Sequence, residues 1–167
     1  INTDGNGRGF LYAGGSHALE PAFTEITKSV MDPQANVSVF QRKMSRDIVN
    51  AANAKTRKEL LAKKDYSLNA LGSGSDYSPF IQHLGISSMN IGFGGEDEGG
   101  EYHSIYDSYD MYKRFKDPTF EYGVALAKVC GRATLRFANA GTLPFDYRNL
   151  HSTINKDTRE LITMAEE

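Results

Sequence analysis

Cysteine and tryptophan are almost missing from this chain of 167 residues, which has one cysteine, Cys130, and no tryptophan. A single cysteine excludes an internal disulfide, and we expect Cys130 to be a small core residue. No apolar run approaches the roughly 20 residues that span a bilayer, so no membrane segment is expected. Neither sign of charge prevails: 19 basic residues stand against 21 acidic ones, giving a net charge of −2. This balance calls for neither nucleic acid nor an anionic membrane as a partner.

The residues that are present can form a core. Hydrophobic residues make up 40% of the chain and charged residues 24%, which excludes disorder on composition. The length suits one domain, or a large piece of a bigger one. The chain begins at Ile1, without Met and without a signal peptide, so we expect it to have been cut from a longer protein.

Helical and buried-strand patterns alternate along the chain and predict an α/β layer structure. Asp117 and Pro118 are typical of a helix start, with Asp117 as N-cap, and Gly141 is typical of the helix end. Ser16 resembles the N-cap of an earlier helix. Strands are expected at 10–12 and 86–93, and 68–76 is expected to be a strand that runs into a glycine turn. Helices are expected at 16–32, within 39–62, at 78–84, at 118–141 and from 149 to the end.

The run Asp4–Gly9, DGNGRG, invites comparison with a calcium-binding loop. The comparison fails because Arg8 stands where an oxygen ligand is needed and Gly15 stands where the closing Glu belongs. Two interpretations stay open. The run is an ordinary turn, or it places Asp4 at the C-terminal end of a strand, where open α/β sheets bind ligands. A carboxylate at that edge would suit a metal ion.

His103 lies in the polar segment EYHSIYDSYD, residues 101–110, after a predicted strand and a glycine-rich loop. A lone histidine in such a loop is more often a surface residue than a ligand, and we assign His17, His83 and His151 to the surface. Around His103, however, tyrosine and aspartate side chains could orient the imidazole. Metal ligation by His103 therefore stays open beside the surface interpretation.

Three segments carry a resemblance to a known family. They are LGSGSDYSPFIQHLGISSM at 71–89, YHSIYDSYDMYKRFKDPTFEY at 102–122 and LPFDYRN at 143–149. In order and spacing the chain resembles the glutamate carboxypeptidase / transferrin receptor-like family of co-catalytic zinc peptidases. The likeness extends back to Ile1–Asp4 and is weakest at 30–66.

The resemblance implies a mixed sheet flanked by helices, in the phosphorylase/hydrolase-like architecture of the zinc exopeptidases, present here as a partial domain. Residues 1–142 would be the C-terminal part of the peptidase domain, and 143–167 the start of a helical dimerisation domain. Two zinc ions are expected in the complete enzyme. Two of their ligands fall on Asp4 and His103, which would approach one another across the mouth of the sheet.

The other zinc ligands and the general-base Glu would precede Ile1, so no catalytic residue is expected in this chain and the isolated chain should be inactive. Tyr102 matches a tyrosine that contacts substrate, and Gly74 and Ser75 match a segment lining the cleft. Glutamate-preferring members have Asn at the position of Ser75 and arginines at those of Asn90 and Gly92. These departures favour a general aminopeptidase or dipeptidase specificity.

The function implied for the complete protein is that of a metallo-exopeptidase, of aminopeptidase or carboxypeptidase type, that hydrolyses peptides outside the cytoplasm or after secretion. Expected partners are the peptide substrate and either a second copy, through the C-terminal helical region, or the remainder of the enzyme. The alternative is a non-catalytic binding or assembly module like the transferrin receptors. Retention of both Asp4 and His103 favours the active enzyme.

Overall fold

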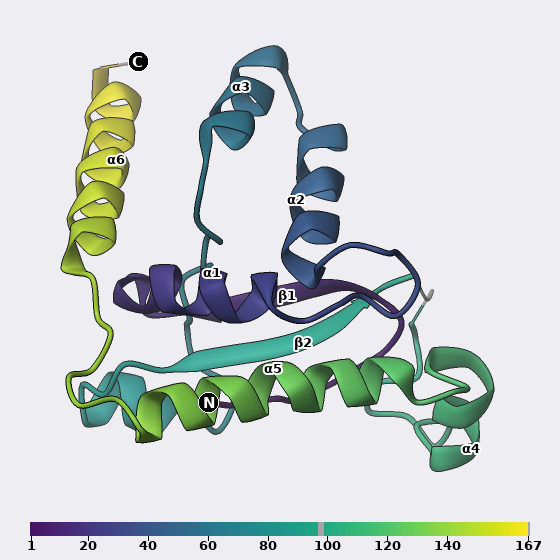
Figure 1. Ribbon diagram of the computed structural model, residues 1–167. Helices are drawn as coiled ribbons and strands as arrows, with labels where there is room; N and C mark the ends of the chain where they lie inside the picture. Colours follow the sequence, from purple (N-terminus) through teal and green to yellow (C-terminus); the bar gives the residue numbers. More distant parts are fainter. Residues whose placement is uncertain (97–98, 167) are drawn as a thin grey trace.

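The computed structural model describes residues 1–96 and 99–166 (Figure 1). Its strands are β1 (Gly9–Gly15) and β2 (Met89–Gly95). The longer helices are α1 (Glu20–Lys28), α2 (Val39–Val49), α3 (Ala54–Ala62), α5 (Glu121–Ala138) and α6 (Tyr147–Glu166). Short turns complete the order: the 3₁₀ turn η1 (His17–Leu19), the π-helical turns η2 (Pro79–His83) and η3 (Tyr112–Lys116), and α4 (Tyr109–Met111).

The sheet at the centre is small and antiparallel. β1 pairs with β2 from Gly9↔Gly95 to Gly15↔Met89. One isolated parallel bridge lies along each outer edge of the sheet: Asn2↔Asn90 beside β2 and Gly14↔Asn69 beside β1. The fold is therefore mixed α/β, as the sequence predicts, and this extent of sheet is compatible with part of a larger domain.

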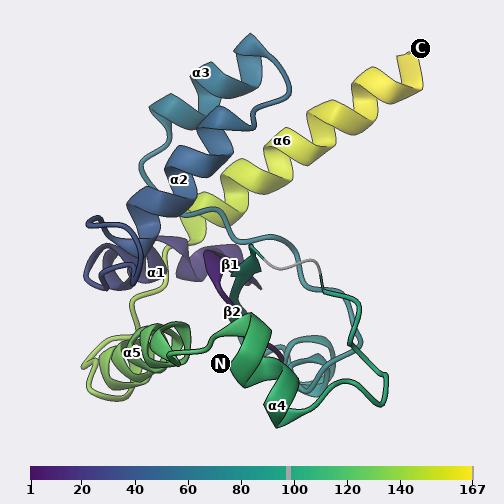
Figure 2. The same cartoon turned by 90° about the vertical axis from the view of Figure 1, so that its right-hand side faces the viewer.

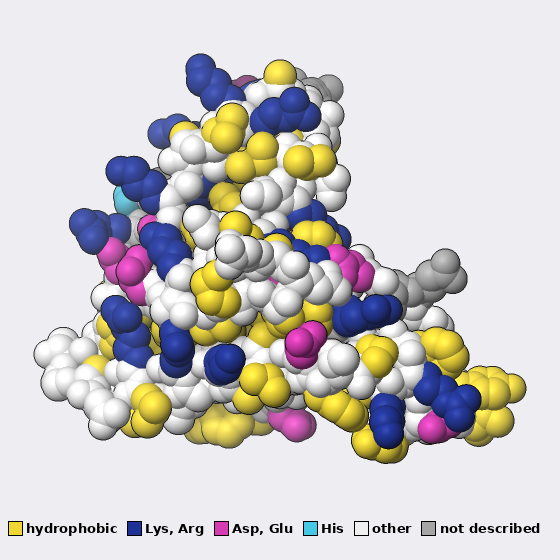
Figure 3. Space-filling view, turned by 45° about the vertical axis from the view of Figure 1, so that its right-hand side comes forward, with side chains coloured by type: hydrophobic (Ala, Val, Ile, Leu, Met, Phe, Trp, Pro, Cys, Tyr) yellow, Lys and Arg dark blue, Asp and Glu magenta, His cyan; other side chains and the backbone are white. Residues whose placement is uncertain are grey.

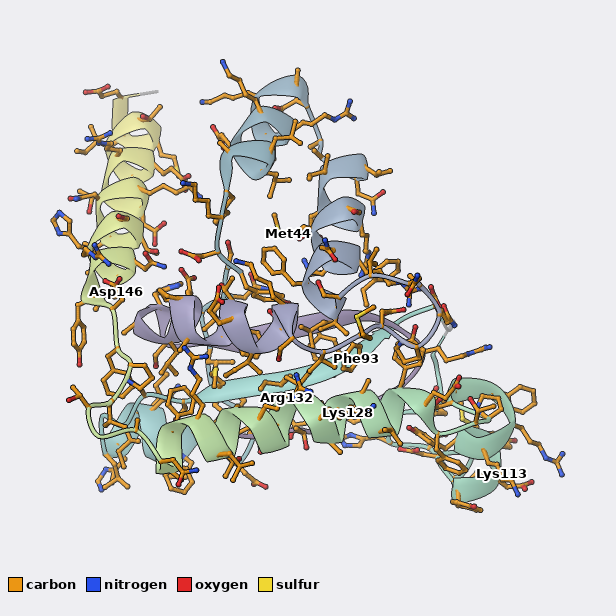
Figure 4. The ribbon with its side chains drawn as sticks, in the orientation of Figure 1. Met44, Phe93, Lys113, Lys128, Arg132 and Asp146 are labelled. Carbon is orange, nitrogen blue, oxygen red and sulfur yellow. The ribbon has the colours of Figure 1, made fainter. Side chains whose placement is uncertain are left out.

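Helix α5 packs against α1 and β2, and buried residues of both helices and both strands form one core cluster (Figure 1). Apolar residues at helical spacing on α1 and α5 meet apolar residues at every second position of the strands, which is why these segments bury one face each. Figure 4 places Phe93 on β2 between α1 and α5, and its ring lies 5.5 Å from that of Tyr122. Arg132 reaches from α5 to the end of α1, where its guanidinium donates to the Ser29 carbonyl at 2.5 Å.

Helix α2 begins with a capping box, in which the Ser38 hydroxyl accepts from the backbone of Gln41 and the Gln41 side chain accepts from the Ser38 backbone. Arg42 then ties α2 to the sheet layer. Its guanidinium donates to the buried Asp32 carboxylate at 2.8 Å and lies over the Phe10 ring, 4.6 Å from the ring centroid. Helices α2, α3 and α6 project away from the layer on the same side (Figures 1 and 2).

Two predicted elements are wrong in detail. The glycine turn expected within 68–76 is present, with bends at residues 73–75, but the strand before it is missing, because only Asn69 is bridged to β1. Helix α5 begins at Glu121 and not at Pro118, since residues 117–120 form a turn that ends with Phe120 in the left-handed region at φ 57°. Asp117 still serves the helix from inside that turn, because its buried carboxylate accepts from the Gly123 backbone at 2.9 Å.

Smaller differences concern the ends of elements. Ser16 precedes η1, but its hydroxyl accepts from the Ser88 backbone and caps no helix N–H.

Cys130 is half-buried at the margin of the core, and burial raises the pKa of its thiol. No described helix combines the length and the apolar character that crossing a membrane requires.

Candidate functional site

Asp4 lies at one edge of the sheet, just after the segment that runs beside β2. The Asn2 backbone donates to Met89 at 2.8 Å and accepts from Ile91 at 3.0 Å, which brings Asn2 next to Asn90. Asp4 follows two residues later, and in extended backbone alternate residues share a face. The sequence thus places the Asp4 carboxylate on the same side of the sheet edge as the Asn2 and Asn90 amides.

Three side chains donate hydrogen bonds to the Asp4 carboxylate. Ser75 Oγ donates to Oδ1 at 2.5 Å, Asn2 Nδ2 to Oδ1 at 2.9 Å and Asn90 Nδ2 to Oδ2 at 2.9 Å. The Ser75 bond contributes most, followed by the Asn2 and Asn90 bonds, and together they hold the pKa of Asp4 below its usual value. Asp4 is therefore an exposed carboxylate that is ionised and oriented, which is the state that a metal ligand needs.

A cavity of about 500 Å³ opens beside Asp4. Tyrosines and carboxylates dominate its wall, so it offers both flat apolar rings and hydrogen-bonding groups. The wall is formed by Asp4, Gly5, Asn6, Tyr12, Glu101, Tyr102, Asp107, Tyr112 and Lys116. Asp4 and Tyr102, which are 98 positions apart in the sequence, thus line one cavity.

The loop that carries Tyr102 also carries His103. The Ser104 backbone and hydroxyl both donate to the Glu101 carbonyl, closing a turn in which His103 is left-handed at φ 58°. The His103 ring stacks on that of Tyr102, with centroids 3.8 Å apart. His103 is exposed and does not belong to the wall of the cavity. Its predicted approach to Asp4 stays a prediction.

Gly74 and Ser75 lie on the turn that precedes η2. Gly74 has φ +111°, a conformation that glycine adopts without strain, and it delivers Ser75 to Asp4. Neither residue lines the cavity that Asp4 and Tyr102 share. The role that the sequence suggests for them, contact with substrate, stays a prediction, while the bond from Ser75 to Asp4 is a contact that the sequence did not predict.

The residues present fit a metal ion only in part. Across residues 1–96 and 99–166, no three side chains of His, Cys, Asp or Glu come together in a group that could hold one. Asp4 fits as a single ligand, because its carboxylate is ionised, exposed and held by neutral donors. His103 is accessible for ligation from the neighbouring loop. Zinc usually takes at least three protein ligands, so further ligands have to come from elsewhere.

Sequence reasoning missed several residues of this site. Asn2 and Asn90 bind Asp4, and the buried Glu101 forms an ion pair with Lys116 in the wall of the cavity. The Lys116 ammonium lowers the pKa of Glu101. A spacing of two residues between Asn2 and Asp4 was a usable signal for the first contact. The contacts of Asn90 with Asp4 and of Lys116 with Glu101 depend on how distant segments pack together, which the sequence does not show.

Comparison with known proteins relates the chain to peptidases. It is 32% identical over 159 residues to the probable glutamate carboxypeptidase VP8 of Zea mays, a match that covers 95% of the chain and 20% of that protein. It is 37% identical over 90 residues to the probable glutamate carboxypeptidase LAMP1 of Arabidopsis thaliana, a match that covers 54% of the chain and 13% of that protein. It is 32% identical over 94 residues to the aminopeptidase NAALADL1 of Mus musculus, a match that covers 53% of the chain and 13% of that protein. No protein-family model matches.

The likeness that the sequence motifs indicate is confirmed: proteins named glutamate carboxypeptidase and NAALADL1 aminopeptidase match much of the chain at 30–40% identity. The chain spans about a fifth of the length of the maize relative and less of the others.

Proposed function

We propose that this chain is one part of a zinc-dependent exopeptidase and that it supplies one ligand to each of two zinc ions, Asp4 to one and His103 to the other. The observation that carries the proposal is the ionised, triply hydrogen-bonded Asp4 on the wall of a cavity that Tyr102 also lines. The names of the relatives support the reaction class, and they do not favour the alternative of a non-catalytic transferrin receptor-like module.

Zinc, when bound, would polarise the scissile carbonyl and lower the pKa of an attacking water. The residues of this chain would bind the metal ions and the substrate. Asp4 and His103 offer an anionic oxygen and a ring nitrogen, and the tyrosines of the cavity bind and orient the peptide. The remaining ligands and the general base come from residues outside these 167.

The specificity that we propose is that of a general aminopeptidase or dipeptidase. Asn90 carries a neutral amide that donates to Asp4, so this position offers no cation to bind an acidic side chain. At Gly92 a Cβ would lie 2.2 Å from the Tyr12 hydroxyl and 2.7 Å from the Gly5 carbonyl oxygen, so any larger side chain would have to displace both Tyr12 and the Gly5 backbone. Both features argue against recognition of an acidic residue at these two positions.

Further parts of the proposal concern the complete protein. Residues 1–142 would complete a peptidase domain and 143–167 would begin a helical region that forms a homodimer or packs on the remainder of the enzyme. The natural setting would be outside the cytoplasm or secreted. These statements rest on the resemblance and on the exposed apolar face of α6.

The test is a peptidase assay on the complete protein, using a panel of dipeptides and aminoacyl substrates with and without a zinc chelator. We expect hydrolysis that the chelator abolishes and added zinc restores. The 167-residue chain in the same assay is the matched control, and we expect no chelator-sensitive turnover from it, because the base and the bridging ligand are missing. Equal hydrolysis with and without chelator would contradict the metal mechanism, and no hydrolysis of any substrate would favour the binding module.

A further inference from the structure

The loop between α1 and α2, residues 29–38, is closed by Asp32. The Asp32 backbone donates to the Val37 carbonyl at 2.9 Å, and Asp32 Oδ1 accepts from the backbone N–H groups two and three positions further on, each at 2.9 Å. An aspartate that accepts in this way from its own backbone is typical of a tight turn. Because the Asp32 carboxylate is buried and bound by Arg42, residues 33–37 are held as a fixed turn at the surface.

Asn36 lies in this turn, and its amide has no task in the fold. The side chain is exposed, and within residues 1–96 and 99–166 it makes no hydrogen bond. Asn2 and Asn90, by contrast, both donate to Asp4. Asn36 also stands outside the cavity that Asp4 lines. A group attached to the Asn36 amide would therefore reach into solvent without breaking a protein hydrogen bond.

Asn36, Val37 and Ser38 form a sequon for N-linked glycosylation, which requires asparagine followed two positions later by serine or threonine, with any residue except proline between them. No other asparagine of the 167 residues is followed in this way. Such tripeptides also arise by chance in sequences. The exposed turn and the unbound amide are what distinguish this one, because a glycan needs a surface loop.

We propose that Asn36 carries an N-linked glycan in the complete protein. Asn36 Nδ2 forms a bond to the anomeric carbon of an oligosaccharide carried on a lipid pyrophosphate. The bond from that carbon to the pyrophosphate breaks, the lipid pyrophosphate leaves with the electron pair, and Nδ2 loses one proton. The transfer takes place in the secretory pathway, so the inference rests on the extracytoplasmic setting of the proposed function and goes beyond it by naming a modified atom.

The structure also orders the transfer and the folding of α2. Ser38 is 5% exposed, and its hydroxyl accepts from the Gln41 backbone at 3.2 Å and donates to Gln41 Oε1 at 3.1 Å. In the folded chain the sequon hydroxyl is thus already engaged as the cap of α2. The glycan has to be attached before this cap forms, while the exposed Asn36 lets it remain afterwards.

A glycan at this position would change the surface around it. Met31 is 55% exposed and Val37 36% exposed, and these apolar side chains lie at the two ends of the turn. A bulky and solubilising glycan would cover them and keep this face clear of protein contacts. Association with another chain would then be left to other surfaces, such as that of α6.

The experiment uses the complete protein, produced with its natural N-terminal region in eukaryotic cells. Trypsin releases residues 29–42 as one peptide, in which Asn36 is the sole asparagine. Enzymatic removal of the glycan in heavy-oxygen water converts a glycosylated asparagine into labelled aspartate, which mass spectrometry detects. We expect labelled aspartate at position 36 in the wild type and in Ser38→Thr, which keeps both the sequon and a capping hydroxyl.

Asn36→Gln should lower the mass of the intact protein by one glycan and leave its peptidase activity unchanged, because the side chain contacts neither the core nor the candidate site. The matched control is Asn139→Gln, an exposed asparagine without a sequon, which should keep the full mass. Ser38→Ala should lose the glycan too. It also loses the cap of α2, so if it does not fold, the comparison of Asn36→Gln with Ser38→Thr decides alone.

Labelled aspartate at position 36, together with the loss of mass in Asn36→Gln alone of the two asparagine variants, supports the inference. Unlabelled peptide 29–42 from protein recovered in the secretory pathway or the medium overturns it and leaves the peptidase proposal standing. Protein found in the cytosol overturns both the glycan and the extracytoplasmic setting. The chelator-sensitive peptidase assay tests the reaction separately from either result.

Discussion

At the scale of single residues, the pKa values of Asp4 and Asp146 are both lowered, for different reasons. Neutral hydroxyl and amide donors stabilise the charge of Asp4. At Asp146 the Arg148 side chain is the main cause, and the Arg148 backbone N–H adds a second hydrogen bond. Because its three hydrogen-bond donors are neutral, Asp4 keeps its negative charge available for a positive ligand. Asp146 already has its counter-charge and serves the fold.

The pKa of Asp146, at about 2, predicts how the start of α6 responds to acid. Asp146 lies at the base of α6, where Oδ1 accepts from the Arg148 backbone at 2.9 Å (Figure 4). Because its pKa is lower in the folded chain than the ordinary 3.8, its stabilising contribution is complete above about pH 4 and is lost as the pH falls towards 2. Backbone chemical shifts of residues 147–150 should report fraying of α6 over that range.

Asp146→Asn tests this assignment, because the amide still accepts a hydrogen bond but no longer titrates. In that variant the loss of helicity at 147–150 between pH 4 and 2 should largely disappear. Asp157→Asn, an exposed position further along α6, is the control and should titrate like wild type. The same acid transition in Asp146→Asn as in wild type would show that another group governs the start of α6.

At the scale of elements, the local sequence pattern was enough to predict most of the helices and strands. Short apolar runs predicted β1 and β2, and helical spacing predicted α1 and α5 to within a few residues. The error at 68–76 is confined to the run LNAL, which is typical of a strand, whereas in the structure Asn69 is its one bridged residue. The error at 117 arose because Asp117 caps α5 from a buried position four residues before its start, and burial is a tertiary property.

In the candidate site as well, the sequence predicted some residues and missed the contacts that depend on tertiary structure. The sequence named Asp4, Tyr102 and Ser75, and the structure brings Asp4 to both of the others, to Tyr102 across a cavity and to Ser75 by a hydrogen bond. Asn90 could not be predicted as a partner of Asp4, because that contact depends on which residue of β2 faces Asn2. The left-handed backbone of His103 was equally hidden, because only a few per cent of non-glycine residues adopt that region, although histidine is enriched among them.

At the scale of the whole molecule, apolar surface is left uncovered. Figure 3 shows hydrophobic side chains exposed where α2 and α3 lie and again near α4, with Lys and Arg between them. Helix α6 has no buried residue along its described length, and Leu161, Ile162 and Met164 on it are 53–71% exposed. Val124 and Leu135 on α5 are exposed as well. Apolar surface of this extent normally marks a contact with another chain or domain.

We therefore predict that the 167-residue chain does not behave as a simple monomer. It should self-associate through α6 at high concentration, and a helix of this length without a partner should exchange its amide hydrogens rapidly in dilute solution. Sedimentation equilibrium and hydrogen exchange measure the two effects. Leu161→Lys combined with Ile162→Lys should reduce association, whereas Lys156→Ala on the same helix should not. A monomer at high concentration with α6 fully protected would contradict this prediction.

The measurement that tests the central claim most directly is anomalous X-ray diffraction at the zinc edge, on crystals of the complete protein loaded with zinc. Two peaks are predicted, separated by about 3.5–4 Å as in two-metal sites, with Asp4 Oδ2 bound at one and a ring nitrogen of His103 at the other. Peaks that lie away from both side chains, or Asp4 and His103 on opposite faces of the folded protein, would contradict the account.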